Sequence, residues 1–351
     1  MKNLVTPLVK YTINKAKTNK FIQNIFESPF DLSKFPESGE FTDSHGNKFV
    51  LRSGLRSKVK PGWEMLAKGA LPERNDEYCR KQKQIGQVAV EKATPVISSF
   101  GKSLDNATIL EVGCNFGATS YSLAECGVKK VVGSEFTGYK VESVESKDDD
   151  RSLQLEEVNA ELKATRERIA SMSADSDKVE FVEDDISNSR LEPGTFDIVC
   201  SWQVLEHVHD TANAFKSMYN LLKDDGILFH EYNPFFSLNG GHSFCTLDFL
   251  WGHVRLNDED FARYLEEIRP EEKERAMSFF KTGLNRTSQK DVRTQLEEAG
   301  FEDITIIPFP KEQHLRMVDR ETLTQCQRNY PNIDLLDLTS PRVYILARKK
   351  K

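Results

Sequence analysis

The chain has 351 residues, of which 38% are apolar and 29% are charged, and its net charge is −7. This length and composition fit one large globular domain, or one domain with substantial additions. Because a mildly acidic chain has no overall attraction for phosphate backbones, nucleic acid is excluded as an expected partner. No apolar run is long enough to cross a membrane, and no signal-peptide h-region is evident. We therefore expect a cytoplasmic protein.

The six cysteines form no C-x-x-C pair. A disulfide framework would require paired spacings in an exported chain, whereas isolated cysteines are typical of reduced thiols in the cytoplasm. The cysteine pattern therefore agrees with a cytoplasmic location.

The N-terminal extension, residues 1–100, is predicted to contain three elements. Residues 1–26 hold five lysines and no acidic residue, and their apolar residues recur at helical spacing, which predicts a basic amphipathic helix. This helix either packs on its own domain or makes a peripheral contact with an anionic membrane surface or a partner. Residues 39–56 predict a β-hairpin. Residues 73–100 predict a helix leading into the core, which Pro95 bends or restarts.

Strands then alternate with helices along the chain. Strands are predicted at residues 108–113, 129–135, 178–183, 196–201, 226–232, 303–308 and 342–348, and helices at about 117–126, 149–172, 207–223 and 287–299. This alternation indicates right-handed βαβ units, and hence an α/β fold with a mostly parallel, seven-stranded sheet covered by helices on both faces. We assign residues 101–232 to the ligand-binding core and 287–351 to the C-terminal part of its sheet.

An insertion at residues 233–286 separates these two parts. It follows the carboxyl end of the fifth strand, where ligands bind in open α/β sheets, so it is interpreted as a cap over the substrate. Helices are expected within residues 258–281. The insertion is rich in Phe and Trp, and these side chains either wall a substrate pocket or form the core of the cap.

A strand, a glycine turn and a helix start follow one another in Ile109–Thr119. Gly113 and Gly117 let the backbone approach a ligand closely, and a helix N-terminus presents free N–H groups. A glycine loop alone is a weak signal, because dinucleotide-binding sites use a similar one.

The spacing of Glu111, Gly113 and Gly117 resembles the first motif, E-x-G-x-x-x-G, of class I S-adenosylmethionine-dependent methyltransferases, with Asn115 in place of the usual middle glycine. The resemblance implies that S-adenosyl-L-methionine is the cofactor and that this loop binds it. Glu135 ends the next strand. By similarity, its carboxylate would accept hydrogen bonds from both ribose hydroxyls, a task that suits an acceptor-only group.

Later motifs extend the resemblance to the ubiquinone-biosynthesis-like branch, also called methyltransferase type 11. Asp185 would hold the adenine amino group, and Ile186 would pack on the ring. The segment 196–208 is close to the pattern F-D-x-V…L-E-H-V and would place Gln203 and His207 in the cofactor pocket. Together with Ala299-Gly300-Phe301, these motifs imply a Rossmann-like fold.

Five of the seven histidines lie between residues 207 and 253. Methyl transfer to a hydroxyl requires donor and acceptor to be held close together and a base to take the proton, and histidine titrates near neutral pH. His242 ranks first because it follows two glycines, then His253, then His230. Any one of them is more often a structural hydrogen bonder. No H-x-x-x-H or close Asp/His spacing appears, so no metal is predicted.

These observations predict an O-methyltransferase whose partner is a small-molecule or glycan acceptor. A sugar hydroxyl in glycan or glycolipid biosynthesis is the first hypothesis. A small aromatic or polyketide-like metabolite is the alternative acceptor. A hypothesis of another class is a binding or scaffolding protein that kept the fold and lost the chemistry.

Overall fold

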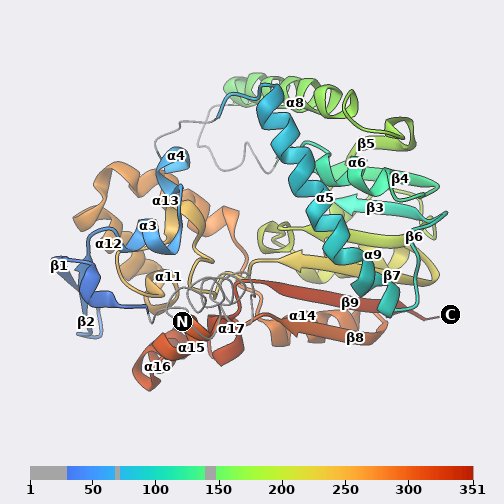
Figure 1. Ribbon diagram of the computed structural model, residues 1–351. Coiled ribbons are helices and arrows are strands. Elements are labelled where there is room, and N and C mark those ends of the chain that lie inside the picture. The colour runs from blue at the N-terminus through green and yellow to red at the C-terminus, as the bar shows by residue number, and fades with distance from the viewer. Residues whose placement is uncertain (1–29, 68–71, 139–147, 351) are drawn as a thin grey trace, which may run out of the picture.

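The computed structural model describes residues 30–67, 72–138 and 148–350, which form a sheet lobe and a helical lobe side by side (Figure 1). The amphipathic helix expected at residues 1–26 lies outside these described residues. Within the described residues, no helix has the length and apolar character that crossing a membrane requires. All six cysteines are free thiols, as their spacing predicted.

The sheet lobe contains a seven-stranded sheet. Its strands are β3 (Thr108–Val112), β4 (Lys130–Glu135), β5 (Val179–Glu183), β6 (Phe196–Trp202), β7 (Leu222–Tyr232), β8 (Phe301–Pro308) and β9 (Val343–Lys349). They lie in the order β5-β4-β3-β6-β7-β9-β8. The pairs from β5 to β7 are parallel, and β9 is antiparallel to both of its neighbours. The predicted mostly parallel sheet is confirmed.

Helices cover both faces of this sheet because alternate strand residues point to opposite sides. Ile109 packs with residues of α5 (Asp76–Ser99) and α6 (Ala118–Ala124), whereas Leu110 packs with residues of α9 (Thr211–Leu221) and α14 (Gln289–Glu298). α8 (Asp148–Ala170) packs on α5 and α6. Short helical turns occur at η1 (Leu32–Lys34), η2 (Ser176–Lys178), η3 (Ile186–Asn188) and η4 (Leu205–His207).

α5 runs through Pro95 without a restart, contrary to one of the two outcomes expected there. Proline removes the hydrogen bond to the carbonyl four residues earlier, which belongs to Glu91. Glu91 is exposed, so water can reach the carbonyl that loses its partner. The helix therefore continues past Pro95.

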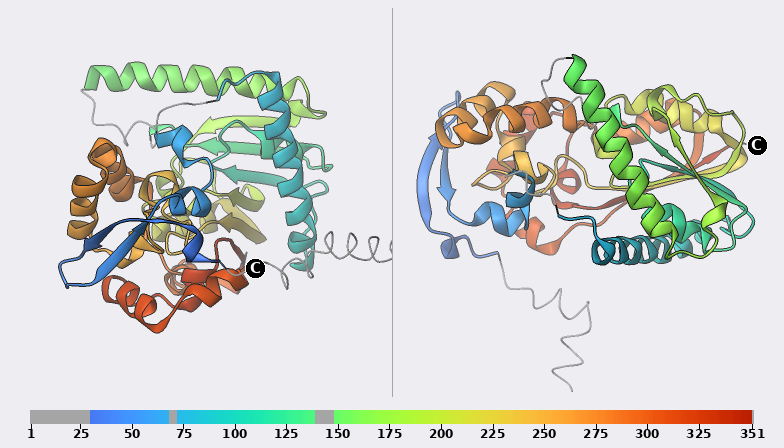
Figure 2. Two further views of the ribbon diagram at one scale, coloured as in Figure 1. Left: turned by 60° about the vertical axis from the view of Figure 1, so that its left-hand side comes forward. Right: turned by 90° about the horizontal axis from the view of Figure 1, so that it is seen from above.

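The helical lobe begins with a hairpin of β1 (Glu37–Thr42) and β2 (Lys48–Arg52), as predicted. Figure 2 shows this hairpin on the outer side of the lobe, away from the sheet. The other elements of the lobe are α3 (Leu55–Val59), α4 (Trp63–Ala67), α10 (His242–Cys245), α11 (Gly252–Arg255), α12 (Asp258–Ile268), η5 (Pro270–Glu272), α13 (Lys273–Ser278), η6 (Phe279–Gly283), α15 (Glu312–Met317), α16 (Arg320–Asn329) and α17 (Leu335–Thr339).

One hydrophobic core unites segments of the helical lobe that are far apart in sequence. It contains Phe41 from the hairpin, Phe235 and Trp251 from the insertion, and Cys326 and Leu338 from the C-terminal helices. Residues 287–351 therefore do more than complete the sheet, because α15–α17 pack with the cap instead. The aromatic side chains form the interior of the lobe, since Phe235 and Trp251 are only 2% and 1% exposed.

A buried ion pair ties the N-terminal extension to the insertion. The Arg56 guanidinium donates to both carboxylate oxygens of Glu272, at 2.8 and 2.6 Å, and to the carbonyl of Ser243 at 2.6 Å. The Arg56 side chain is 3% exposed and that of Glu272 is 12% exposed. Removing one partner of such a pair leaves the other charge buried and uncompensated.

We predict that Arg56→Met lowers the free energy of unfolding by about 3–5 kcal/mol, because Glu272 loses its partner in a buried site. Lys48→Met breaks the exposed Lys48–Glu40 pair and should cost less than about 1 kcal/mol. Urea unfolding of the two variants measures the difference. Adding Glu272→Met to Arg56→Met should restore part of the lost stability. Equal losses in Arg56→Met and Lys48→Met would contradict the view that the buried pair stabilises the fold.

Candidate functional site

The turn after β3 is built around two glycines in left-handed conformations. Gly113 has φ of 67° and Gly117 has φ of 74°. A Cβ atom at Gly113 would lie 2.5 Å from the side chain of Val204, and one at Gly117 would lie 2.3 Å from Phe181. Because a Cβ atom at either position would collide with these side chains, glycine lets the turn lie directly against β5 and the segment after β6.

Hydrogen bonds hold this glycine loop from two sides. The backbone N–H of Asn115, which has φ of 45°, donates to Glu135 Oε2 at 2.6 Å. Arg166 of α8 donates from Nε to the Asn115 carbonyl at 2.8 Å, and its guanidinium lies 4.2 Å from the centre of the Phe181 ring. The loop, the end of β4 and α8 are thereby fixed to one another.

Glu111 lies beneath the loop and is 3% exposed. It accepts a hydrogen bond from the Ser120 hydroxyl at the start of α6. Burial raises the pKa of Glu111 to about 8, because the charged form loses its hydration. In this geometry Glu111 orders the start of α6.

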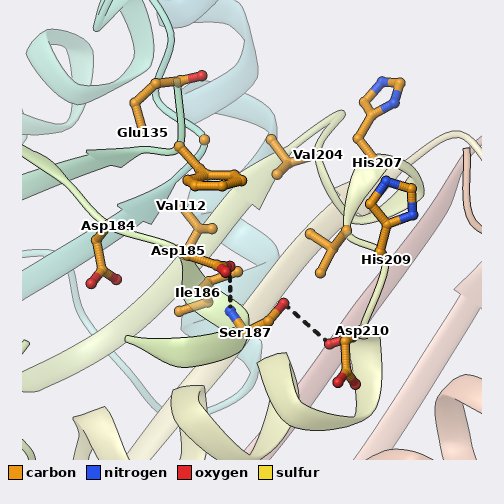
Figure 3. Close-up of a pocket in the computed structure, with 13 residues that line it drawn as sticks. Val112, Glu135, Asp184, Asp185, Ile186, Ser187, Val204, His207, His209 and Asp210 are labelled. Atoms are coloured by element: carbon orange, nitrogen blue, oxygen red, sulfur yellow. Dashed lines mark hydrogen bonds between the residues drawn. The ribbon is translucent and has the colours of Figure 1, made fainter. Parts of the chain in front are cut away.

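A cavity of about 290 Å³ lies at the carboxyl ends of the parallel strands. It lies beside β3 and β6, between which the strand order reverses, and such a switch point is where open α/β sheets bind ligands. Of the predicted cofactor residues, five line it: Gly113, Glu135, Asp185, Ile186 and His207. Figure 3 shows Glu135, Asp184 and Asp185 on one side of the cavity, and His207, His209 and Asp210 on the other.

Two adjacent aspartates follow β5, and they differ in their hydrogen bonds. Asp185 Oδ1 accepts the N–H of Ser187 at 2.9 Å, which caps η3. Asp184 is 8% exposed, and its Oδ1 accepts the N–H of Arg190 at 2.9 Å. Its Oδ2 is buried without a hydrogen-bond partner. Asp184 therefore lines the cavity with a carboxyl group whose unpartnered oxygen is buried in the protein.

The other four predicted cofactor residues do not line this cavity. Glu111, Asn115 and Gly117 shape the loop. Gln203 has φ of 57°, its N–H donates to the Glu231 carbonyl at 2.7 Å, and its side chain is exposed. Gln203 therefore turns the chain at the end of β6.

Sequence reasoning missed several residues of the cavity wall. These are Val112, Phe136, Asp184, Ser187, Val204, Val208, His209 and Asp210. Most are direct neighbours of predicted residues. The sequence thus indicated the segments that form the wall, namely the ends of β4 and β5 and the turn after β6, without indicating these particular residues. Which neighbour points inward depends on local backbone geometry, which the motif does not encode.

Glu206, His207 and His242 meet beside the cavity, and we call this group the histidine cluster. The ring of His207, which lines the cavity, lies 5.1 Å from the ring of His242 between centroids. Ligand-type atoms of Glu206, His207 and His242 all lie within 4.8 Å of one another, close enough to share one bound ion or one small group. Spacing alone could not reveal this set, since His242 comes from the insertion.

Polar atoms in this cluster are left without partners. Glu206 is 1% exposed, and its Oε2 has no hydrogen-bond partner. The Nε2 atom of His242 is also buried and unpartnered. His207 Nδ1 donates to the Gly283 carbonyl at 2.6 Å. Burial lowers the pKa of both His207 and His242, so both rings are neutral at pH 7.

The structure does not bring His230 or His253 to the cavity. His230 is fully buried in β7 and pairs through Nδ1 with the Ser201 hydroxyl at 2.7 Å. His253 is 1% exposed, and its Nε2 donates to the Phe235 carbonyl at 2.8 Å. Burial lowers their pKa values to about 3 and about 4, respectively. Both histidines serve as neutral structural groups in this geometry.

The donor and acceptor set of the cavity fits S-adenosylmethionine. Glu135 presents a carboxylate beside the glycine loop, and Asp185 lines the same cavity with a second one. Ile186 and Phe136 supply apolar walls for a ring. Such a mixture of apolar walls and a few fixed polar groups is typical of cofactor sites.

Comparison with known proteins identifies the family of this chain. Residues 85–306, more than half of the chain, match the model of a family described as a methyltransferase domain. A curated relative, the ubiquinone biosynthesis O-methyltransferase of Neisseria meningitidis serogroup C, is 28% identical over 160 residues, which are 45% of this chain and 57% of the relative. A second, from serogroup A of the same species, is 27% identical over the same length. The chain thus spans little more than half the length of these relatives.

Solved structures show a distant likeness as well. Phosphoethanolamine N-methyltransferase 2 of Haemonchus contortus, in complex with S-adenosyl-L-methionine, is 16% identical, with a TM-score of 0.41, covering 74% of this chain and 53% of that one. A putative S-adenosylmethionine-dependent methyltransferase of Listeria monocytogenes is 15% identical, with a TM-score of 0.44, covering 76% and 100%. On the family match and the seven-stranded sheet, the chain belongs to the class I S-adenosylmethionine-dependent methyltransferases.

Proposed function

We propose that this protein transfers a methyl group from S-adenosylmethionine to a hydroxyl oxygen of its acceptor. The observation that carries the proposal is the contact between His207, which lines the cofactor cavity, and His242, whose Nε2 has no partner. A neutral imidazole one ring away from the cavity is suited to take a hydroxyl proton. The relatives are named O-methyltransferases, which supports oxygen as the acceptor atom.

Each wall of the cavity has a distinct role in this proposal. Glu135 accepts hydrogen bonds from the ribose hydroxyls, while its bond to Asn115 keeps the carboxylate in place. Asp185 accepts a hydrogen bond from the adenine amino group through Oδ2, because Oδ1 caps η3. Phe136 and Ile186 hold the ring by apolar contact. When bound, S-adenosylmethionine supplies an electrophilic methyl group on its sulfonium.

His242 is the proposed base. Burial is the main cause that lowers its pKa, and electrostatic interactions with His207 and Lys60 add to it. The ring is therefore neutral and its lone pair is available at pH 7. His253 and His230 are less suitable, because backbone or core hydrogen bonds engage them away from the cavity.

A sugar hydroxyl is the acceptor class that we favour. Glu206 and His207 lie beside His242, and the charge of Lys60 influences its pKa. This polar set matches a polyhydroxylated ligand. The insertion's aromatic side chains do not offer a stacking wall, because most are interior. A small aromatic acceptor is the second candidate, and the ubiquinone-related name of the relatives favours it. Turnover assays with matched sugar and catechol acceptors separate the two.

A scaffold that has lost its chemistry is the competing class of function. Titration of the protein with S-adenosylhomocysteine by calorimetry tests it directly. We expect heat of binding with one site per chain, since the glycine loop and Glu135 are held as a cofactor would require. The absence of binding would favour the scaffold.

The first functional prediction concerns Glu135. Glu135→Ala should weaken S-adenosylhomocysteine binding by about 1.5–3 kcal/mol, because it removes a charged acceptor from hydroxyl donors. Glu180→Ala is a suitable control, since Glu180 is an exposed residue of the neighbouring strand β5 and does not line the cavity. Unchanged affinity in a folded Glu135→Ala variant would show that the ribose is held elsewhere.

The second functional prediction concerns Arg166 of α8. Arg166→Ala should weaken cofactor binding by about 1 kcal/mol, because the Asn115 carbonyl loses a charged donor that holds the loop. Lys163→Ala, on an exposed position of the same helix, should have no effect. Calorimetry with S-adenosylhomocysteine gives both values, and equal affinities would remove α8 from the description of the cofactor site.

The third functional prediction concerns His242. His242→Ala should lower turnover by roughly 10²–10⁴-fold while leaving cofactor affinity nearly unchanged, as expected for loss of a general base. Since its pKa lies below the ordinary 6.5, the wild-type rate should stay flat from pH 8 down to 6.5 and fall only at lower pH. His253→Ala serves as the comparison. A loss of turnover confined to His253→Ala would move the role to that residue.

A further inference from the structure

The segment after α3 brings a lysine to the histidine cluster. Arg56 of α3 donates to the carbonyl of Ser243, the residue next to His242. Lys60 follows Arg56 by four residues, and its backbone N–H closes the last turn of α3 on the Arg56 carbonyl at 2.8 Å. Lys60 is the C-cap residue of this short helix, so its backbone lies one helical turn beyond the arginine that contacts the insertion.

Lys60 is half-buried and forms no ion pair with any residue that the structure describes. After burial, which is the largest cause, the positive charge of Lys60 is among the influences on the pKa values of Glu206, His207 and His242, and it lowers each of them. An ammonium group that has lost part of its hydration is stabilised when a ligand brings an opposite charge next to it. Unpartnered buried atoms on Glu206 and His242, beside it, are further signs that a polar ligand completes this cluster.

We propose that the acceptor carries an anionic oxygen group, a carboxylate or a phosphate, which Lys60 binds while Glu206 and His242 meet the neighbouring hydroxyl. This inference rests on the proposed hydroxyl methylation and narrows its substrate class. The three segments of chain that meet here are the N-terminal extension, the turn after β6 and the insertion. The anion and the reacting hydroxyl are thereby fixed relative to the cofactor cavity, which His207 lines.

The charge balance of the cluster favours an anion over a cation. Burial raises the pKa of Glu206 to about 8, so its carboxyl is mainly neutral at pH 7. Both imidazoles are neutral as well. Lys60 then contributes the only full charge among these four groups, and it is positive. A divalent metal ion bound in the cluster would be repelled by this positive charge.

Calorimetry on the protein saturated with S-adenosylhomocysteine tests the proposal without turnover. The probes are inorganic phosphate, D-glucuronate and D-glucose. We expect phosphate and glucuronate to bind and glucose to bind at least tenfold more weakly. Lys60→Met should lower the affinity for both anions at least tenfold, Lys60→Arg should retain it, and Lys58→Met, an exposed control two residues earlier, should leave it within twofold.

Unchanged S-adenosylhomocysteine affinity shows that the variants are folded, and Lys60→Gln replaces Lys60→Met if the latter is not. Equal binding of glucuronate and glucose, no binding of either anion, or wild-type affinity in the Lys60→Met variant would each overturn the proposal. So would tight binding of Mg²⁺ or Zn²⁺ that Glu206→Gln abolishes, because the cluster would then be a cation site. Methyl transfer is assayed separately, so a failure of the proposed reaction remains distinguishable from a failure of anion recognition.

Discussion

The site depends on one close approach of backbone to side chains. The turn after β3 lies against Val204 and Phe181, and no Cβ atom fits at Gly113 or Gly117. This contact places the Asn115 N–H within reach of Glu135, which ends the next strand. The cavity then lies between the ends of β3, β4, β5 and β6, where the strand order reverses. A side chain at either glycine would collide with Val204 or Phe181, so the turn could keep its position only if these residues moved.

Burial decides the chemistry of the polar groups around that cavity. Glu206 and Glu111 are both pushed toward the neutral form, and so are the imidazoles of His207 and His242. Neutral imidazole is the form that accepts a proton, so desolvation favours the proposed base even as it makes the base weaker. Because burial neutralises Glu206, Lys60 has no opposite charge in this cluster. Burial is thus the common cause of the proposed proton transfer and of the proposed recognition of an anionic acceptor.

The sequence predicted the sheet lobe well because its signals are local. Alternating short apolar runs and helical repeats placed all seven strands to within a few residues, and the motif at Glu111–Gly117 marked the loop. The helical lobe was less accessible. Its core joins Phe41, Phe235 and Leu338, which lie hundreds of residues apart, and α15–α17 carry no pattern that assigns them to the cap. Similarly, His242, His253 and His230 look alike in sequence, and only tertiary packing separates an unpartnered imidazole from two that are engaged.

Lys60 was not considered from sequence because a lone lysine in an extension carries no spacing signal. Its importance comes from the way the two lobes meet. The sheet lobe supplies the cofactor cavity together with Glu206 and His207, whereas the helical lobe supplies Lys60 and His242. The Arg56–Glu272 pair and the bond from Arg56 to Ser243 lock the extension onto the insertion next to these groups. Substitutions in the helical lobe can therefore alter which acceptor binds. The glycine loop, Glu135 and the cavity walls, which hold the cofactor, remain unchanged by them.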